Sequence, residues 1–594
     1  MTQNTPLDFK LTSSCRLDDM TTTTGNWVAA ASIDDLPIGG RKLLRHYDKR
    51  IALFRTEQAI YAVDNRCPHQ GYALLQGDVK QETLTCAWHN WKFELDEGGN
   101  CSFGGEAVRA YPVEVRGGQV MVDVTDPSAE VIAPQLFQSL IEALGEVDIG
   151  RMARDTMRLR EIGTPLAEVV KEGVNFGAPR MEYGWNHSLA TLTDCLNLAS
   201  LFEGELQALP VVQGMSVISQ TEVRRPFRPR PEAIDPVEVY GSLEDALAAY
   251  PALVDDEQKD EAEALIRGLI ATGVSPDRIR HALLSAITDH FLGYGHPMIY
   301  AQKSFEMLDA IGWEHADTVL GPLVPNMVLS TRYDRLPYMK KFLKAWDQAD
   351  PNLAEFHARQ DGAEFESDSF MRSVLDGDAP HAFEALNTAL ANGVSVSKIL
   401  DATSLSAAER FRRFDIDLDA DDTNEWGWLD VTHNMTYLNA LRWAWSVDPS
   451  PQVLRGVYHA VWFVNFTSRF DQADHNRTID PFHNTDSEVI VDAIRNKDPD
   501  GAQAAIAGFE GPAEELHGAL AQGAAEDNSV APIMIAHAVK TTRASIVESK
   551  VLGTREPMVA AGRFLASPKR ERFVFNATLE AIDFTRGRAR GEGK

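Results

Sequence analysis

Residues 66–78 read RCPHQGYALLQGD, residues 85–93 read TCAWHNWKF, and these two stretches decide the fold of the first part of the chain. The first has the pattern C-x-H and the second C-x-x-H, with sixteen residues between the two patterns. Each stretch therefore contributes one thiol and one imidazole. The four side chains are Cys67, His69, Cys86 and His89. A set of these residue types, drawn from two loops, predicts a metal centre.

Thiolate and imidazole ligands suit the two irons of a [2Fe–2S] cluster in different ways. Two anionic thiolates hold one ferric iron, and two neutral imidazoles hold the reducible iron and raise its potential, which is the Rieske arrangement. Two cysteines and two histidines are also a ligand set for structural zinc. Zinc motifs usually pair like ligands, as C-x-x-C followed by H-x-x-x-H. Because each stretch here mixes the two ligand types, the pattern favours the iron–sulfur cluster.

Residues 27–124, which contain both stretches, have the pattern of a small antiparallel β domain. Short segments rich in β-branched and aromatic residues, such as RIALFRT (50–56) and QVMVDV (119–124), are separated by turn signals. Glycine pairs at 98–99 and 117–118 mark two of these turns. Strands this short and this closely spaced predict a barrel or sandwich.

The pattern changes from strands to helices after residue 126. Long Ala- and Leu-rich runs follow, and in GVSPDRIRHALLSA (273–286) Ser275 suits an N-cap and Pro276 the first helical position. We therefore predict a multidomain chain, with an N-terminal all-β barrel followed by a large all-α domain of irregular helical repeats. Its parts are an N-terminal extension (1–26), the β domain (27–126) and the helical domain (127–594).

The helical part contains a weak internal repeat. ANGVSVSKILDATSLSA (391–407) resembles ATGVSPDRIRHALLSA (271–286), and GPAEELHGALAQGAAED (511–527) is a fainter third copy. Each copy is followed by a predicted helix that begins near a histidine. These histidines are His296, His433 and His537. Their separations differ, so irregular helix-pair units around one core are favoured over a regular solenoid.

Histidines at corresponding places in repeat units can converge on one site, and His187 also lies near the start of a predicted helix, as His296, His433 and His537 do. Converging imidazoles, with a carboxylate such as Asp289 or Asp430, can hold a non-haem iron, because these ligands suit Fe(II). One imidazole can instead act as a general base with a pKa near neutrality. The alternative is that these histidines cap or bridge helices in the core. The candidate catalytic residues are His290, His296, His433 and His537.

Residues 27–124 resemble the Rieske [2Fe–2S] domain family. The resemblance rests on CPHQG (67–71) and CAWHNWKFELDEGGNC (86–101), which match the two ligand loops of that family. It implies that Cys67 and Cys86 bind one iron and that His69 and His89 bind the other. The respiratory members carry an extra cysteine in each loop, and this chain has none at those positions. The resemblance is therefore to the low-potential ferredoxin-like and oxygenase-type members.

The helical part differs from the catalytic domain of Rieske oxygenases and is similar to another family. The oxygenase signature D-x-x-H-x-x-x-x-H is not matched by Asp289-His290, which is followed by His296 after a gap of five residues. GYGHPMIYAQKSFEML (293–308) and WGWLDVTHNMTYLNALRWAW (426–445) resemble helices of the questin-oxidase-like family. That resemblance implies an oxygen-inserting oxidation of a small organic substrate.

Composition narrows the partners and the location. The 594 residues carry a formal net charge of −30, which repels phosphate backbones and argues against nucleic acid. No stretch of about 18 uncharged apolar residues is present, and the first residues lack an apolar leader, so we expect no membrane and a cytoplasmic protein. No nucleotide-binding fingerprint is present, so we expect a separate reductase or ferredoxin as the electron donor.

Two functions are consistent with these features. The first is an oxidoreductase, oxygenase-like, in which a Rieske cluster passes electrons to a helical domain that oxidises an organic substrate with O₂. In many Rieske oxygenases electrons cross between subunits, so this reading is compatible with a homo-oligomer. The second is a non-catalytic Rieske electron carrier or redox sensor whose helical part is a docking scaffold, because helical repeats often build binding surfaces.

Overall fold

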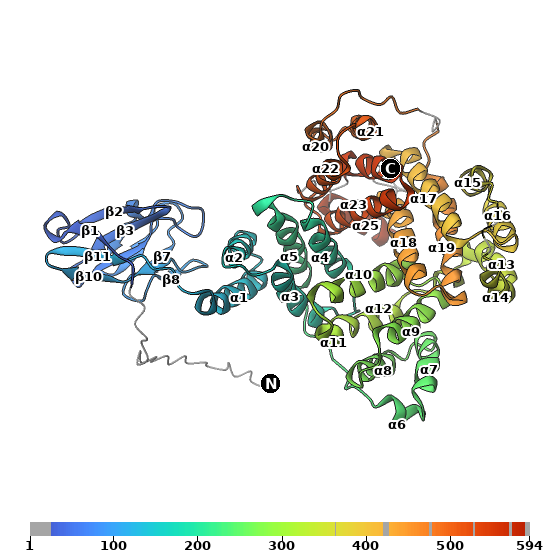
Figure 1. The fold of residues 1–594 in the computed structure, drawn as a ribbon, viewed down its shortest axis with the longest axis horizontal. Coiled ribbons are helices and arrows are strands. Elements are labelled where there is room, and N and C mark those ends of the chain that lie inside the picture. Colours follow the sequence, from blue (N-terminus) through green and yellow to red (C-terminus); the bar gives the residue numbers. More distant parts are fainter. Residues whose placement is uncertain are drawn as a thin grey trace. The chain divides into compact units, whose positions relative to one another are not determined.

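The computed structural model describes residues 25–360, 362, 364–419, 427–473, 478–526, 529–569 and 573–587. It divides into two compact units, with the division after Pro134 (Figure 1). Nearly all of the expected extension at 1–26 lies outside the described residues. No helix within these ranges has both the length and the apolar character needed to cross a membrane.

The N-terminal unit consists of short antiparallel strands in three sheets. The strands are β1 (Trp27–Ser32), β2 (Arg41–His46), β3 (Lys49–Arg55), β4 (Ile60–Asp64), β5 (Asp78–Lys80), β6 (Thr83–Thr85), β7 (Lys92–Glu94), β8 (Asn100–Phe103), β9 (Ala110–Tyr111), β10 (Val113–Arg116) and β11 (Gln119–Asp123). The sheet orders are β1-β11-β10, β2-β3-β4-β9 and β5-β6-β7-β8. The third sheet carries the second ligand loop, between β6 and β7.

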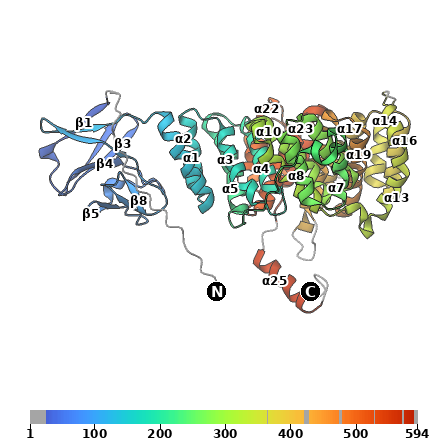
Figure 2. The same cartoon turned by 90° about the horizontal axis from the view of Figure 1, so that it is seen from below.

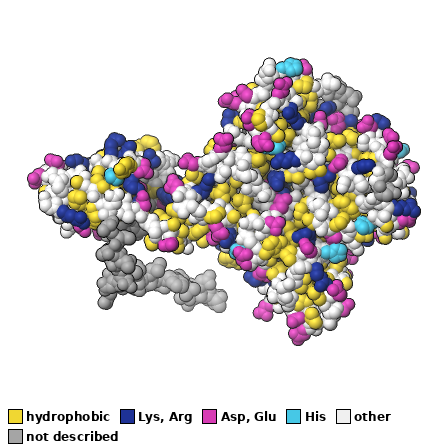
Figure 3. Space-filling model, viewed as in Figure 1, with side chains coloured by type: hydrophobic (Ala, Val, Ile, Leu, Met, Phe, Trp, Pro, Cys, Tyr) yellow, Lys and Arg dark blue, Asp and Glu magenta, His cyan; other side chains and the backbone are white. Residues whose placement is uncertain are grey.

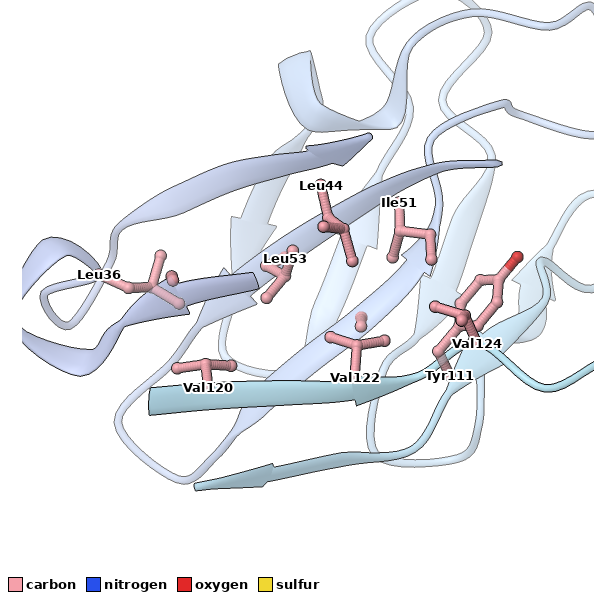
Figure 4. Close-up of a cluster of buried hydrophobic side chains, with 10 residues drawn as sticks. Leu36, Leu44, Ile51, Leu53, Tyr111, Val120, Val122 and Val124 are labelled. Atoms are coloured by element: carbon pink, nitrogen blue, oxygen red, sulfur yellow. The ribbon is translucent and has the colours of Figure 1, made fainter. Parts of the chain in front are cut away.

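Strand β3 separates two hydrophobic cores. Side chains alternate between the two faces of a strand, and Ile51 and Leu53 lie in the first core, with Leu44, Val120 and Val122 (Figure 4). The intervening Ala52 and Phe54 lie in the second core. The other buried members of the second core are Val63, Cys67, Leu74, Leu84, Cys86, Phe93, Leu95 and Val108. The two thiols of the predicted metal centre are thus core residues of the β unit.

The second unit is built of helices joined by loops, and its described residues contain β-structure only as isolated bridges. Its longer helices are α1 (Ala129–Glu146), α2 (Ile149–Glu161), α3 (Leu166–Gly177), α4 (His187–Ala199), α5 (Ala208–Glu222), α6 (Pro236–Tyr240), α7 (Leu243–Asp255), α8 (Lys259–Ala271), α9 (Pro276–Asp289), α10 (His296–Ile311), α11 (Ala316–Leu320), α12 (Leu323–Leu329), α13 (Lys340–Ala349), α14 (Leu353–Ala358), α15 (Ser367–Asp376), α16 (Ala379–Ala391), α17 (Val396–Arg413), α18 (Trp428–Val447), α19 (Pro451–Phe466), α20 (Ser487–Arg495), α21 (Pro499–Gly508), α22 (Ala513–Ala525), α23 (Pro532–Leu552), α24 (Glu556–Ala566) and α25 (Phe573–Thr585). Helix α25 extends away from the others (Figure 2).

The internal repeat corresponds to a helix pair followed by a helix that carries a histidine. Helices α8 and α9 lead to α10, α16 and α17 lead to α18, and α21 and α22 lead to α23. Helices α2 and α3 form a further pair, which leads to α4. In three of the pairs a glycine in the left-handed region ends the first helix, where a side chain would be strained. These are Gly163, Gly273 and Gly393, with φ of +88°, +74° and +79°.

The four histidine-bearing helices pack around one another. Helix α4 contacts α10 and α23, and α18 contacts the same two helices. The four therefore enclose a common interior to which each can contribute side chains. On the outside, acidic and basic side chains are interspersed over the face shown in Figure 3.

Candidate functional site

The two ligand loops of the β unit have the same backbone design. The Gly71 N–H donates to the Cys67 carbonyl at 2.8 Å, and the Asn90 N–H donates to the Cys86 carbonyl at 3.1 Å. Gly71 and Asn90 stand at equivalent positions and both have positive φ, +75° and +61°. Glycine and asparagine are the residues that adopt this conformation at least cost. Each loop therefore turns back just after its cysteine and histidine.

The loops bring like donors together. Cys67 and Cys86 are buried, and burial, together with the neighbouring Cys86, raises the pKa of Cys67 to about 11. The rings of His69 and His89 meet edge to face with centroids 4.5 Å apart. His69 is half-buried and His89 is exposed. The thiols thus lie on the inner side and the imidazoles on the solvent side.

This arrangement fits a [2Fe–2S] cluster. The His69 Nδ1 atom is buried and has no hydrogen-bond partner among the described residues, although a buried imidazole nitrogen is ordinarily satisfied. A metal bond would satisfy it, and a metal would also keep the Cys67 thiol ionised despite its burial. Trp91 stacks on His69, 4.8 Å between centroids and 12° between planes, and holds that ring in place. Two donor pairs, thiol with thiol and imidazole with imidazole, match the two irons of the cluster.

A second cluster of donors lies inside the helical unit. It consists of four imidazoles, one from each of α4, α10, α18 and α23. We call His187, His296, His433 and His537 the four-histidine cluster. The Nε2 atom of His296 lies 3.2 Å from Nε2 of His187 and 3.1 Å from Nε2 of His433. The His537 ring lies 4.9 Å from that of His187 and 5.3 Å from that of His433, between centroids.

Hydrogen bonds on the outer side of the cluster set the tautomers. His296 Nδ1 lies 2.6 Å from the Gly293 carbonyl, and His433 Nδ1 lies 2.6 Å from the Leu429 carbonyl. A carbonyl oxygen only accepts, so each Nδ1 carries the hydrogen and each Nε2 presents a lone pair. Two lone pairs that face each other at 3.1 Å repel unless a proton or a cation lies between them. Such outer-side hydrogen bonds are typical of metal-ligating histidines.

Polar side chains on α18 and α23 contact Nδ1 of the other two histidines. Thr432 donates its hydroxyl to the Leu429 carbonyl at 3.0 Å and lies 2.7 Å from His537 Nδ1. That hydroxyl is therefore free to accept from His537 Nδ1, which leaves the lone pair on Nε2. His187 Nδ1 lies 2.5 Å from Lys540 Nζ, one turn after His537 on α23.

The electrostatics of the cluster favour neutral imidazoles. Burial, followed by the nearby charge of Lys540, lowers the pKa of His296 to about 4. Burial, together with Lys540 and the other imidazoles of the cluster, holds the pKa values of His187, His433 and His537 well below the ordinary value of a histidine. Burial also lowers the pKa of Lys540 to about 7. Neutral imidazole is the form that binds metals.

Of the four candidate catalytic histidines, the structure brings His296, His433 and His537 together and places His290 elsewhere. His290 lies directly after α9, with Nδ1 2.8 Å from Asp334 and Nε2 3.1 Å from Asp255. His187 completes the cluster instead. Its signal in the sequence is its place at the start of a helix that follows a helix pair, as for His296.

The four-histidine cluster is a set of donors without a preformed cage. As the side chains stand, no group of three or more His, Cys, Asp or Glu residues in the described ranges is arranged to hold a metal ion. Any ion bound there requires the imidazoles to turn from these positions. Tyr294 adjoins the cluster, with its ring centroid 5.2 Å from that of His433, and burial and the neighbouring Asp430 raise its pKa.

The β unit is similar to known proteins. Residues 26–112 match the family model described as Rieske [2Fe-2S] domain. The ferredoxin component of the naphthalene 1,2-dioxygenase/salicylate 5-hydroxylase systems of Ralstonia sp. is 32% identical over 100 residues, which are 17% of this chain and 96% of the relative. The ferredoxin component of the alkene monooxygenase system of Xanthobacter autotrophicus is 28% identical over 102 residues, 17% of this chain and 83% of the relative.

Solved structures are similar over the same share of the chain. The ferredoxin of carbazole 1,9a-dioxygenase from Nocardioides aromaticivorans is 25% identical, covers 17% of this chain and 98% of its own, and has a TM-score of 0.16. The family model, the ligand spacing and the paired donors concern the same segment. The chain therefore belongs to the Rieske [2Fe–2S] domain family, and residues 26–112 are the part that carries this domain.

Proposed function

We propose that this protein is an oxidoreductase that oxidises a small organic substrate with O₂. In this proposal the β unit accepts electrons, one at a time, from a reductase or ferredoxin, and the four-histidine cluster is where the substrate is oxidised. The observation that carries the proposal is the meeting of the Nε2 atoms of His187, His296 and His433, with contacts of 3.1–3.2 Å, in the same chain as a Rieske domain.

The residues of the β unit support electron entry at its solvent side. Cys67, Cys86, His69 and His89 would hold the cluster, which when bound supplies a one-electron carrier. His89 is exposed, and the neighbouring Trp88 is 57% exposed. A donor protein could therefore come close to the imidazole side of the loops. Several relatives that match this domain are ferredoxin components of oxygenase systems, which supports such a role.

The residues of the helical unit fit a non-haem iron. Imidazoles suit Fe(II), and His296 Nε2 lies 3.2 Å from that of His187 and 3.1 Å from that of His433, so these side chains would hold the ion after their rings turn. Bound iron would supply a centre for the reduction of O₂. The Gly293 and Leu429 carbonyls hold the His296 and His433 rings with Nε2 turned inward.

Aromatic side chains beside the cluster provide an apolar setting for the substrate. Phe463 stacks near His433 with centroids 6.1 Å apart, and Trp462 stacks on Phe466 at 4.4 Å. Tyr338, which is 49% exposed, stacks in turn on Phe466. This run of rings reaches from the surface to the four-histidine cluster and suits a flat hydrophobic molecule.

Iron content and substrate-dependent O₂ consumption test the proposal. We expect the purified protein to hold iron in excess of the two ions of a [2Fe–2S] cluster. The double variant His296→Ala/His433→Ala should lose the excess iron and the O₂ consumption and keep the electron paramagnetic resonance signal of the reduced cluster. His381→Ala, at an exposed histidine on α16, is the matched control and should keep all three.

A different result would favour the carrier or sensor function. If the wild-type protein holds only the iron of the cluster, and if the double variant behaves as the wild type does, the four histidines do not form a catalytic metal site. The helical repeats would then be a docking scaffold, as such repeats often are.

A further inference from the structure

A second group of buried ionisable side chains continues from the four-histidine cluster along two of its helices. Asp194 lies on α4, seven residues after His187, and Lys303 lies on α10, seven residues after His296. Seven residues are about two helical turns, roughly 10 Å along the axis, and return to the same face of the helix. Glu306 follows Lys303 by one turn. We call Asp194, Lys303 and Glu306 the ion chain.

The ion chain is connected by short contacts and becomes more exposed along its length. Lys303 Nζ lies 2.8 Å from Asp194 Oδ1 and 3.1 Å from Glu306 Oε2. The side chains of Asp194, Lys303 and Glu306 are 0%, 5% and 22% exposed. Asn197 and Gln302 donate to the Glu306 carboxylate at 2.9 and 3.0 Å. Lys303 therefore bridges a carboxylate in the interior and one at the surface.

The inner end of the ion chain is within electrostatic range of Lys540. The negative charge of Asp194 raises the pKa of Lys540 and the positive charge of Lys303 lowers it, so the three groups are within electrostatic range. Lys540 in turn contacts His187 Nδ1 at 2.5 Å. The charge of the interior carboxylate thus acts on the lysine that adjoins the four-histidine cluster.

Asp194 is poorly satisfied for a buried carboxylate. Apart from the close contact with Lys303, neither of its oxygens has a hydrogen-bond partner among the described residues. Buried charged groups that serve only stability are ordinarily both paired and hydrogen-bonded. Burial, with a further contribution from the charge of Glu306, raises the pKa of Asp194 to about 6 against the opposing charges of Lys303 and Arg543. A group with a pKa near the working pH exchanges protons readily.

We propose that Glu306, Lys303 and Asp194 form a proton path from the surface to the four-histidine cluster. The proposal rests on the proposed function, because O₂ reduction at a buried site consumes protons. Insertion of one oxygen atom of O₂ into the substrate takes two electrons, from the donor protein through the Rieske domain, and two protons, and releases one water. For each proton, Asp194 gives its hydrogen to the site, the Lys303 ammonium restores it, and Glu306 passes to Lys303 a proton taken from solvent.

Hydrogen–deuterium exchange at Asp194 tests the path without reference to activity. The metal-free full chain is mixed rapidly with D₂O near pH 6, and infrared spectroscopy follows the isotope shift of the buried carboxylic acid, which Asp194→Asn identifies by removing it. We expect Glu306→Gln to slow this exchange by about tenfold or more. This factor is smaller than the rate acceleration of about 100-fold or more that one positioned proton-transfer group usually contributes. Asp309→Asn, at an exposed carboxylate on the same helix, is the matched control and should leave the rate unchanged.

Two outcomes overturn the path. One is exchange in Glu306→Gln at the wild-type rate, and the other is the absence of any carboxylic acid signal that Asp194→Asn removes. If Asp194→Asn does not fold, the Glu306→Gln variant still tests the path, because Glu306 is partly exposed and its replacement should not prevent folding. Slower exchange of the carboxylic acid in that variant would support the path.

Turnover separates the path from the proposed function. With an active wild-type protein, Glu306→Gln should lower substrate oxidation by about 100-fold and leave reduction of the Rieske cluster by its donor unchanged. If Glu306→Gln slows exchange at Asp194 but the wild-type protein oxidises no substrate, the proposed function is overturned and the proton path stands. If Glu306→Gln exchanges at the wild-type rate and the wild-type protein is active, the proton path is overturned and the proposed function stands.

Discussion

At the scale of single residues, the β unit presents the four side chains that we propose as cluster ligands in two equivalent turns. Gly71 and Asn90 let the backbone reverse after each cysteine and histidine. Burial places the thiols inside the second core, and the imidazoles remain on the solvent side. All four proposed ligands of the cluster therefore come from two short contiguous segments of the chain.

Replacement of one thiol should remove the cluster. In Cys86→Ser we expect loss of the visible absorption of the cluster and of the iron it contains, because serine lacks the soft anionic sulfur that ferric iron needs in this set. Cys101→Ser is the control, since Cys101 lies outside the two ligand pairs on β8. Absorption spectra and iron per chain measure the effect, and an intact spectrum in Cys86→Ser would contradict the ligand assignment.

The buried imidazole of His296 should make the metal-free helical unit less stable in acid. Its pKa is about 4 in the folded protein and near 6.5 in the unfolded chain. Between these values the unfolded chain binds more protons, so stability rises with pH and is lost as the pH falls from 6.5 toward 4. From pH 7 to pH 5 the loss from this group is about 2 kcal/mol.

Urea unfolding at the two pH values measures this effect. In His296→Gln, which keeps a polar side chain without the titrating ring, the difference between pH 7 and pH 5 should shrink by about that 2 kcal/mol. An unchanged pH dependence would show that His296 does not titrate as a buried group.

At the scale of elements, a left-handed turn aims the first residue of α10 at the four-histidine cluster. Gly293, Tyr294 and Gly295 all have positive φ, of +53°, +55° and +82°. A Cβ on Gly295 would lie 2.6 Å from the Tyr437 ring. The turn therefore needs glycine both for its conformation and for its close packing.

Gly295→Ala should be more harmful than the same change in another left-handed turn. Both Gly295→Ala and Gly273→Ala pay about 1–2 kcal/mol for the left-handed backbone. Gly273 has open space around its Cβ position, whereas at Gly295 the clash adds about 1–3 kcal/mol and displaces His296. Urea unfolding and excess iron content compare the two variants. Equal stability and equal iron would show that the turn does not position the histidine.

At the scale of the whole molecule, the chain joins two units with separate cores. The β unit has its own buried clusters around β3, and the helical unit encloses the four histidines between α4, α10, α18 and α23. The resemblance to ferredoxin components covers only 17% of the chain. In our proposal the rest of the chain provides the site that uses the electrons.

Separation of the two units should separate the two chemistries. We expect residues 25–134 expressed alone to fold and to show the spectrum of a Rieske cluster, because both of their cores lie within that segment. Residues 135–594 should keep the excess iron and lose donor-driven oxidation of the substrate. Spectra, iron content and O₂ consumption of the two fragments check this. Donor-driven activity in the helical fragment alone would contradict the electron route.

The β domain and the helical domain could be predicted from the sequence alone, and the four ligands could be proposed from it. Cys67, His69, Cys86 and His89 stand out as candidates because each pair lies within four residues of chain, and local spacing is visible without a fold. The strand and helix patterns could be read for the same reason, since their periods of 2 and 3.6 residues are local.

Which helical histidines meet is visible in the folded protein alone. His296 contacts His187 across 109 residues and His433 across 137 residues, and such distances along the chain carry no local signal. The sequence therefore favoured His290, which is close to His296 in the chain and lies in a separate ion-pair network. His187 joins the cluster because packing of α4 against α10 and α23 brings its ring inward. Convergence of donors from four helices is a property of how the helices pack, and not of any one segment.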